Sequence, residues 1–255
     1  MRKLIMLTLC CALFFSHSLW AQKTDVKDAL LKKNVVKINL VSLVFKNASL
    51  QYERVVAPKM SFALGVSIMP KSGLPFAQSL KENFADNDDA QRAIESTKLS
   101  NFSITPEYRF YVGKKGAPIG FYVAPYLRYS KMTFEQLYEF TASNNKVYKP
   151  LISGDINNIG GGVMLGSQWA LGSNITLDWW IAGGHIGSSS GTLLGKADMS
   201  DMSEADKKQL ENDIEAVDIP LYDFDATVRS NEVEVKLKGG SAGIRAFGIA
   251  LGFRF

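Results

Sequence analysis

Cysteine is almost absent from this sequence. The two that occur, Cys10 and Cys11, are adjacent and lie within an apolar stretch over residues 4–15. The rest of the chain therefore has no cysteine with which to form a disulfide, and its stability must come from other interactions.

The apolar stretch has the features of a signal peptide. Arg2 and Lys3 precede it, it is too short to span a bilayer comfortably, and Ala21 offers a small residue at a cleavage point. We expect residues 1–22 to be removed on export, which leaves residues 23–255 as the mature chain in an oxidising compartment.

Long apolar runs and an excess of one charge are also missing. After residue 22 no run is long enough for a membrane-spanning helix, which needs about 20 apolar residues. Loss of Arg2 and Lys3 lowers the formal charge by two, from +4 to +2, which gives no reason to expect a nucleic-acid partner. A mature chain without such a helix can cross a membrane only as a closed β-barrel, because lipid leaves backbone polar groups no other partners.

Alternation of apolar and small or polar residues is the dominant pattern. Between Ser61 and Met69, Phe62, Leu64 and Val66 alternate with serine, alanine and glycine. Similar patterns predict eight strands, at residues 33–45, 48–56, 60–69, 99–112, 119–132, 156–171, 175–186 and 240–255. A soluble lipocalin-like barrel or a β-sandwich also alternates, but its outward face is charged. Here the polar face is rich in Gly, Ala and Ser, which favours a narrow lumen and an apolar face turned to lipid.

Connection length supports the same fold. Links near 57–59, 113–118 and 171–174 are short, whereas those at 70–98, 133–155 and 187–239 are long. Outer-membrane barrels have short periplasmic turns and longer outer loops. We therefore predict an all-β, eight-stranded antiparallel transmembrane β-barrel with three long outer loops and short helices in the loops, or ten strands if 226–238 joins the wall.

Aromatic residues are expected to mark the two membrane interfaces. Those near the short turns or the end of the chain are Phe62, Phe110, Phe121, Trp169, Phe253 and Phe255, and those toward the other rim are Phe102 and Tyr129.

The last ten residues, Ala246 to Phe255, resemble the closing strand of outer-membrane barrels. With the signal peptide and the strand pattern, the chain resembles the small OmpA/OmpX-type barrels of the Gram-negative outer membrane. The resemblance implies that Phe253 and Phe255 are read by the barrel-assembly machinery as an insertion signal, and that outer-membrane lipid surrounds the wall. It implies a fold rather than an activity.

Charged residues on the predicted inward face form a candidate site. They are Lys37, Glu53, Glu107, Arg109, Arg128, Asp178 and Arg254. Because an eight-stranded barrel has room for little more than side chains, we expect these charges to pair across the lumen and plug it. The alternative is a narrow, porin-like channel.

An enzymatic alternative depends on His185. It is predicted to face lipid near Ser188, and some small barrels are lipid A deacylases with a rim Ser–His pair. No acidic residue is evident to orient the histidine, so we expect no enzymatic activity and no cofactor. Acidic loop residues lack a calcium-binding pattern, and we expect no metal site.

Function is therefore expected on the outer loops. Residues 79–97 are polar and helical in pattern, Ser203 begins a capping motif, and 232–238 alternates like a strand whose exposed edge can pair with a partner. We predict a structural or surface-interaction role through loops 70–98 and 187–239.

Overall fold

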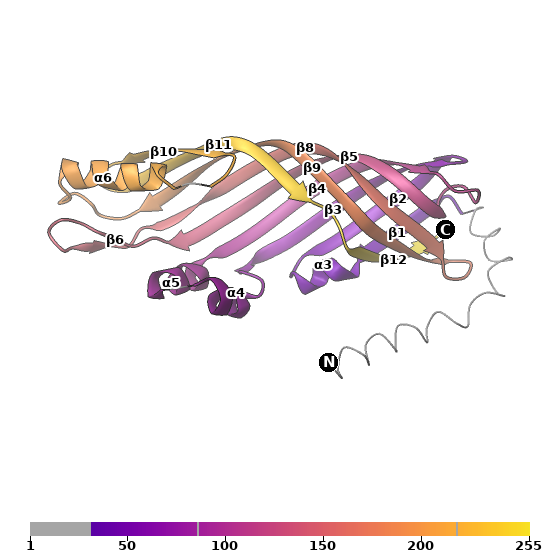
Figure 1. Ribbon diagram of the computed structural model, residues 1–255, viewed down its shortest axis with the longest axis horizontal. Coiled ribbons are helices and arrows are strands. Elements are labelled where there is room, and N and C mark those ends of the chain that lie inside the picture. The colour runs from indigo at the N-terminus through magenta and orange to yellow at the C-terminus, as the bar shows by residue number, and fades with distance from the viewer. Residues whose placement is uncertain (1–31, 86, 218) are drawn as a thin grey trace.

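Antiparallel strands make up most of the computed structural model, which describes residues 32–85, 87–217 and 219–255 (Figure 1). The predicted signal peptide at 1–22 lies outside the described residues. The strands are β1 (Asn34–Asn39), β2 (Ala48–Ala57), β3 (Met60–Gly73), β4 (Lys98–Tyr111), β5 (Gly120–Leu137), β6 (Phe140–Thr141), β7 (Val147–Tyr148), β8 (Leu151–Ala170), β9 (Ile175–Lys196), β10 (Tyr222–Val228), β11 (Glu232–Ile244) and β12 (Gly248–Arg254). The helices are α3 (Leu40–Val44), α4 (Ala77–Phe84), α5 (Asp88–Ser96) and α6 (Glu204–Glu215).

The main sheet contains ten strands and closes on itself. Its order is β10-β11-β9-β12-β1-β2-β3-β4-β5-β8, and β8 also pairs with β9, which completes a ring. The closed circuit runs from β9 through β12, β1, β2, β3, β4, β5 and β8 back to β9. Strands β10 and β11 lie outside this circuit, because β11 pairs with the far half of β9 and β10 pairs with β11.

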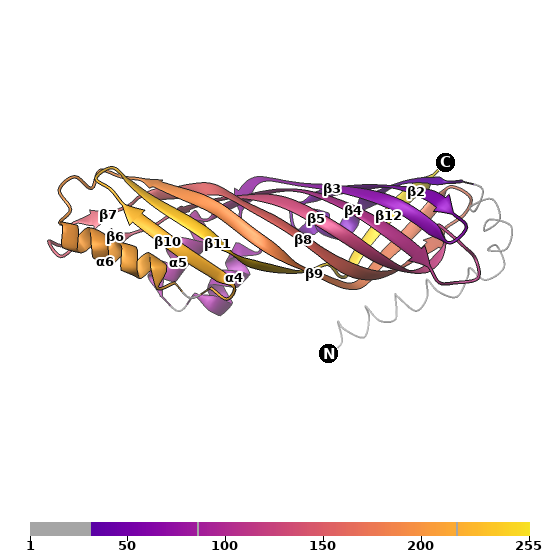
Figure 2. The same cartoon turned by 90° about the horizontal axis from the view of Figure 1, so that it is seen from above.

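The two ends of the barrel differ in their connections. At the turn end, short links join β2 to β3, β4 to β5 and β8 to β9. At the loop end, β5, β8 and β9 continue well past the circuit and carry β10, β11 and α6 with them (Figures 1 and 2). Strand β9 alone has 22 residues, about twice the 9–11 that a tilted membrane strand needs. The loops predicted at 133–155 and 187–239 therefore contain long extensions of the barrel strands.

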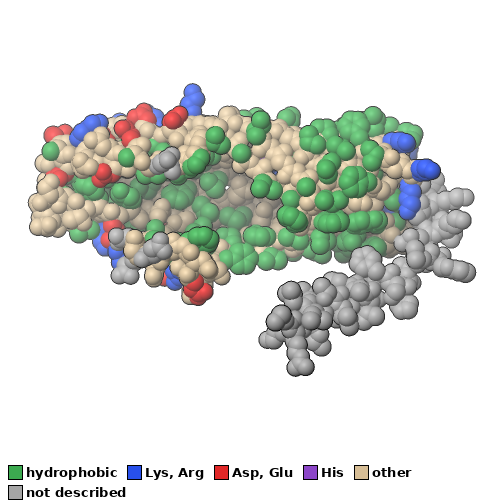
Figure 3. All heavy atoms as spheres, viewed as in Figure 1, with side chains coloured by type: hydrophobic (Ala, Val, Ile, Leu, Met, Phe, Trp, Pro, Cys, Tyr) green, Lys and Arg blue, Asp and Glu red, His purple; other side chains and the backbone are tan. Residues whose placement is uncertain are grey.

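Polar side chains face inward and large apolar side chains face outward around the circuit. On β3, Ser61 and Ala63 are fully buried, whereas Phe62 and Leu64 are exposed. Figure 3 shows apolar side chains gathered over the half of the molecule that contains the closed circuit, and charged side chains gathered mainly at its two ends. Among the described residues no helix is both long enough and apolar enough to span a membrane.

The first predicted strand ends early. It was expected to continue to residue 45, but it stops at Asn39 and the chain turns into the short helix α3. The Asn39 side chain accepts a hydrogen bond from the Ser42 amide at 3.1 Å, and the Ser42 hydroxyl donates to the Asn39 carbonyl at 2.8 Å. Asparagine is a strong helix N-cap, so this local motif overrides the alternating pattern.

The last predicted strand is broken in two. Residues 232–244 form β11, residues 248–254 form β12, and the link between them includes Phe247 at a φ of 57°. Both strands pair with β9, so they follow one path with an irregular step between them.

A hydrophobic core lies at the loop end. Helix α6 begins at the capping residue Ser203, and its Leu210 and Ile214 pack with Val233 and Val235 of β11. The side chains of Glu211 and Glu215 accept hydrogen bonds from the Val228 and Ala226 amides of β10, at 2.9 and 3.2 Å.

This arrangement corrects the prediction of an exposed strand at 232–238. That segment lies inside β11, paired on one side with β9 and on the other with β10. The outer edge of β10 is in turn covered in part by α6, because two of its amides donate to Glu211 and Glu215. Coverage of this kind removes donors that a partner strand would need.

Candidate functional site

Six charged side chains meet inside the barrel at its turn-end half, and we call them the interior charge cluster. They are Lys37 of β1, Glu53 of β2, Glu107 and Arg109 of β4, Asp178 of β9, and Arg245 of the link between β11 and β12. The first five have no exposed side-chain surface, and Arg245 has almost none.

Two cations share two carboxylates in one part of the cluster. The Lys37 Nζ donates to Glu53 and lies 2.7 Å from Asp178 Oδ2. Arg109 Nη1 lies 2.7 Å from the same Asp178 oxygen and 3.3 Å from Glu53. Each carboxylate therefore touches two cations.

Glu107 joins the second part of the cluster. Arg109 Nη2 lies 2.5 Å from Glu107 Oε1, and Arg245 Nη1 donates to Glu107 Oε2 at 2.5 Å. The Arg245 guanidinium also lies over the Trp180 ring, 4.3 Å from its centroid. Arg245 therefore closes the cluster on the loop-end side.

Neutral side chains take up further hydrogen bonds of the carboxylates. Tyr111 and Ser61 donate to Glu53 at 2.6 and 2.5 Å, and Tyr122 donates to Asp178 at 2.7 Å. The Gln51 amide donates to Glu107 at 2.9 Å. A buried charge is tolerated when it is paired and its remaining sites are hydrogen-bonded, and these carboxylates meet both conditions.

The charges of the cluster balance, because three carboxylates face three cations. Five of the six side chains have no exposed surface, so we expect the cluster to act as a seal across the lumen. A barrel of this circumference has little lumen beyond what its own side chains occupy.

The structure brings together five of the seven residues predicted for the lumen: Lys37, Glu53, Glu107, Arg109 and Asp178. The other two lie elsewhere. Arg254 is buried at the turn end, where it donates to the carbonyls of Gly172 and Ile175. Arg128 lies toward the loop end, where it donates to Thr105 at 3.1 Å.

Sequence reasoning missed Arg245, because uninterrupted alternation places residue 245 on the same outward face as residue 247. The irregular step between β11 and β12 reverses which residues face inward, and Arg245 therefore faces the lumen. The signal was present, since an arginine facing hydrocarbon is costly and so argues for an irregularity in the strand.

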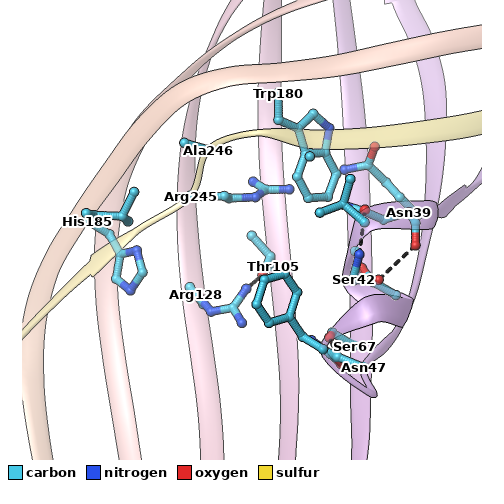
Figure 4. A pocket seen from close by; sticks show the side chains of 17 residues that line it. Asn39, Ser42, Asn47, Ser67, Thr105, Arg128, Trp180, His185, Arg245 and Ala246 are labelled. Atoms are coloured by element: carbon cyan, nitrogen blue, oxygen red, sulfur yellow. Dashed lines mark hydrogen bonds between the residues drawn. The ribbon is translucent and has the colours of Figure 1, made fainter. Parts of the chain in front are cut away.

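A cavity, which we call the lumen pocket, lies on the loop-end side of the cluster (Figure 4). Its volume is about 360 Å³. Its walls combine residues of α3, β2, β3, β4, β5 and β9 with the link between β11 and β12. Figure 4 shows Arg128 and Arg245 pointing into the space between His185 on one side and Asn39 and Ser42 on the other.

The position of His185 differs from the prediction. It was expected to face lipid, but it lines the lumen pocket, and its Nδ1 lies 3.0 Å from the Tyr126 hydroxyl. The cause is a bulge between β8 and β9, where Leu165 pairs with Ala182 and the next residue of β8 pairs with Trp180. Because β9 has one extra residue there, each later residue of β9 faces the opposite side from the one that uninterrupted alternation predicts.

His185 and Ser188 do not face each other. Three residues apart on one continuous strand, the two side chains lie on opposite faces of the sheet. Ser188 is exposed and pairs with the outward residue Ile159, so the suggested Ser–His pair does not form. Within 32–85, 87–217 and 219–255, no three His, Cys, Asp or Glu side chains gather in a way that suits a metal ion.

Comparison with known proteins gives a family and two weak structural likenesses. The family described as "Protein of unknown function (DUF3575)" matches residues 5–211. No curated protein matches the sequence. The N-terminal beta-barrel domain of Pseudomonas aeruginosa OprF is similar at a TM-score of 0.25 and 10% identity, over 88% of this chain and 98% of that one. A major outer membrane protein from Thermus thermophilus is similar at a TM-score of 0.33 and 13% identity, with the same coverage of 88% and 98%. At these TM-scores neither likeness carries an argument.

Proposed function

This chain belongs to the DUF3575 family, and from that premise we propose that it is a non-enzymatic β-barrel protein of the Gram-negative outer membrane with a structural or surface-interaction role. The observation that carries the proposal is the inverted distribution of side chains around the closed circuit. Lys37, Glu53 and Arg109 are buried in the lumen, whereas Phe62 and Leu64 face outward. A soluble barrel buries its apolar residues instead.

Lipid is the solvent that suits this surface. The outward apolar side chains of the circuit include Val36, Ile38, Leu50, Phe62, Leu64, Ile68, Phe110, Phe121, Leu127, Trp169, Ile175, Trp179, Ile249, Leu251 and Phe253. Exposed to water, a continuous surface of this kind would drive aggregation. Within a bilayer it costs nothing, and the closed backbone pairing satisfies the ring's peptide groups.

The outward aromatic residues support one membrane interface at the turn end. Phe62, Phe110, Phe121, Trp169, Phe253 and Phe255 are all exposed there, and the rings of Phe253 and Phe255 stack at a centroid distance of 6.4 Å. Such a girdle is expected where the hydrocarbon ends. In this proposal Phe253 and Phe255 also serve as the signal read by the barrel-assembly machinery.

The interior charge cluster favours a structural role over a channel, because five of its six paired side chains have no exposed surface. The surface role is assigned to the loop end, where α4, α5, α6 and the extended strands project beyond the circuit (Figure 1). The helices belong to loops 70–98 and 187–239, which face the cell exterior in the proposed orientation.

Fractionation tests the proposal directly. The full chain is expressed in a Gram-negative host, and the mature protein is expected in the outer membrane, migrating faster on a gel without boiling than after boiling. Leu64→Arg is expected to lower its recovery there, because an arginine facing mid-bilayer costs about 2–4 kcal/mol. The matched control is Phe84→Arg on α4, an exposed apolar residue outside the circuit. Recovery in the soluble periplasm, or equal losses in the two variants, would overturn the proposal.

A further inference from the structure

Three irregularities of the barrel wall meet at one level. Strand β1 ends at Asn39, which is opposite Ala250, so α3 stands beside the start of β12. The step between β11 and β12 falls at 245–247, and the bulge between β8 and β9 falls beside Trp180. Residues from all three places line the lumen pocket.

The wall is open on the loop-end side of α3. Residues 241–244 of β11 pair with β9, but the pairing of β11 with β10 begins only at Gly239, opposite Tyr222. No strand within the described part of the chain occupies the other edge of 241–244, because the segment that would continue β1 has become α3. Figure 3 shows the molecule hollowed on this face, between the projecting strands and the helices opposite them.

Apolar side chains flank this opening on both sides. Val44 and Phe45, at the end of α3, are 63% and 46% exposed. Across the opening, Ile244 is 87% exposed and Phe247 is 75% exposed. In the proposed membrane orientation these residues contact acyl chains, so the route from the lumen pocket leads sideways into the bilayer.

Inside the opening, Arg128 carries a positive charge that no nearby carboxylate of the described residues balances. The interior charge cluster neutralises itself, and no carboxylate of the described residues lies within ion-pair distance of Arg128. Its hydrogen bond to Thr105 uses one of the five donors of a guanidinium. Arg245 faces the same space but is already paired with Glu107.

Oxyanions are the ligands that best match a half-buried guanidinium, because both oxygens of a phosphate or carboxylate can accept from it at once. Ser42, Asn47 and Ser67 in the same pocket supply further polar groups for a headgroup. We propose that the lumen pocket binds the oxyanion headgroup of an anionic membrane amphiphile, which enters sideways between α3 and β11 and places its charge on Arg128.

The size of the pocket fits this assignment. A volume of about 360 Å³ lies near the lower end of the range for small-molecule sites, about 300–1,000 Å³. It accommodates a headgroup and the start of one chain, and the rest of the chain lies between the apolar flanks and in the bilayer. The assignment rests on the proposed membrane location, since the amphiphile comes from the surrounding lipid.

Native mass spectrometry of the mature protein in uncharged detergent tests the site. The probes are palmitoyl-lysophosphatidylglycerol, which is anionic, and palmitoyl-lysophosphatidylcholine, which has the same chain and no net charge. The wild type is expected to retain the anionic probe at least about tenfold better, and Arg128→Gln is expected to lose that preference. The matched control is Arg54→Gln, which makes the same change at an exposed arginine of β2 and is expected to behave like the wild type.

A second variant tests the lateral entry route without changing any charge. Val41→Trp narrows the opening from α3 and is expected to reduce retention of the anionic probe without altering any charge. Equal retention of the two probes, or an Arg128→Gln protein that retains the anionic probe like the wild type, would overturn the site.

Inorganic phosphate distinguishes the source of the oxyanion. If phosphate alone binds as tightly as the anionic lipid, and with the same dependence on Arg128, the bilayer is not the source and the proposal fails. Heat-modifiable migration of the same preparation reports on the barrel separately. If it is present while lipid selectivity is absent, only the site is wrong; if it is absent, the proposed function fails and the lateral route fails with it.

Discussion

Lys37 of β1 and Asp178 of β9 lie 2.7 Å apart although an entire strand, β12, runs between their own strands. The contact is possible because the inward positions of β12 at this level are Ala250 and Gly252. A small inward side chain on the intervening strand lets the lysine reach over it. The interior charge cluster therefore depends on residues that carry no charge.

Replacement of Gly252 tests that dependence. A Cβ at Gly252 would lie 2.7 Å from Thr176 Cγ2 and 2.9 Å from Lys37 Cγ, closer than real contacts allow. Gly252→Ala is expected to displace Lys37 and to destabilise the protein by about 1–3 kcal/mol. The measurement is the urea midpoint of unfolding from lipid vesicles. Gly73→Ala is the control, because a Cβ there meets nothing within 4 Å, and equal shifts in both variants would contradict the steric account.

Asp178→Asn is expected to lower the free energy of unfolding more than Gly252→Ala does. It leaves Lys37 and Arg109 buried against one fewer carboxylate, and loss of one partner from a buried ion pair is destabilising by about 3–5 kcal/mol. The control is Asp155→Asn. The side chains of Asp155 and its partner Lys131 are each nearly half exposed, so loss of this ion pair is expected to cost less than about 1 kcal/mol. Both free energies of unfolding come from the same urea titration, and a difference below about 1 kcal/mol would speak against a sealed, dry cluster.

The seal also predicts an electrical result. In planar bilayers the wild type is expected to show no steady conductance, because the lumen is filled by paired side chains between β1, β4 and β9. Arg109 contacts Glu53, Glu107 and Asp178, so it is the residue on which the packing most depends. A steady wild-type conductance that changes in Arg109→Ala would replace the plug with a gated pore.

The loop end is expected to loosen in acid. The Val228 amide donates to Glu211, and this hydrogen bond holds the pKa of the Glu211 carboxyl below its usual value. A lowered folded-state pKa adds stability above the ordinary glutamate pKa, and that stability is lost as pH falls through the folded value. Hydrogen exchange at the Val228 amide, corrected for its intrinsic pH dependence, should therefore quicken below about pH 4.

Glu211→Ala is expected to give the same faster exchange at neutral pH. Asp213→Ala, on the exposed side of the same helix, serves as the control. Exchange at the Val228 amide that is unchanged by Glu211→Ala would show that α6 does not protect the edge of β10.

The sequence predicts the barrel better than it predicts the pocket. Alternation on β3 and β4 and the short turns are local patterns, and they place Glu53, Arg109 and Asp178 at a common depth. The irregularities depend on other signals. The capping preference of Asn39 competes with alternation, and the bulge beside Trp180 and the step before Phe247 shift parity without any turn residue to mark them.

Both reversals of the inward and outward faces can nevertheless be detected in the sequence. Uninterrupted alternation assigns His185 and Arg245 to the lipid face, where a polar ring or a guanidinium is costly. Each such conflict implies an irregularity between that residue and the regular part of its strand. The lumen pocket lies where these irregularities occur, so it is formed by residues that depart from the alternating pattern.

The most direct test of the outward apolar face is a nitroxide scan along β3. Single cysteines are placed at residues 61–68 of a chain that has no cysteine after Cys11, labelled, and reconstituted in vesicles. Labels at Phe62, Leu64 and Ile68 are expected to be accessible to oxygen dissolved in lipid and shielded from a water-soluble nickel chelate, whereas labels at Ser61, Ala63 and Ser67 are expected to be shielded from both. A scan in which the outward labels meet the nickel chelate instead would contradict the membrane barrel.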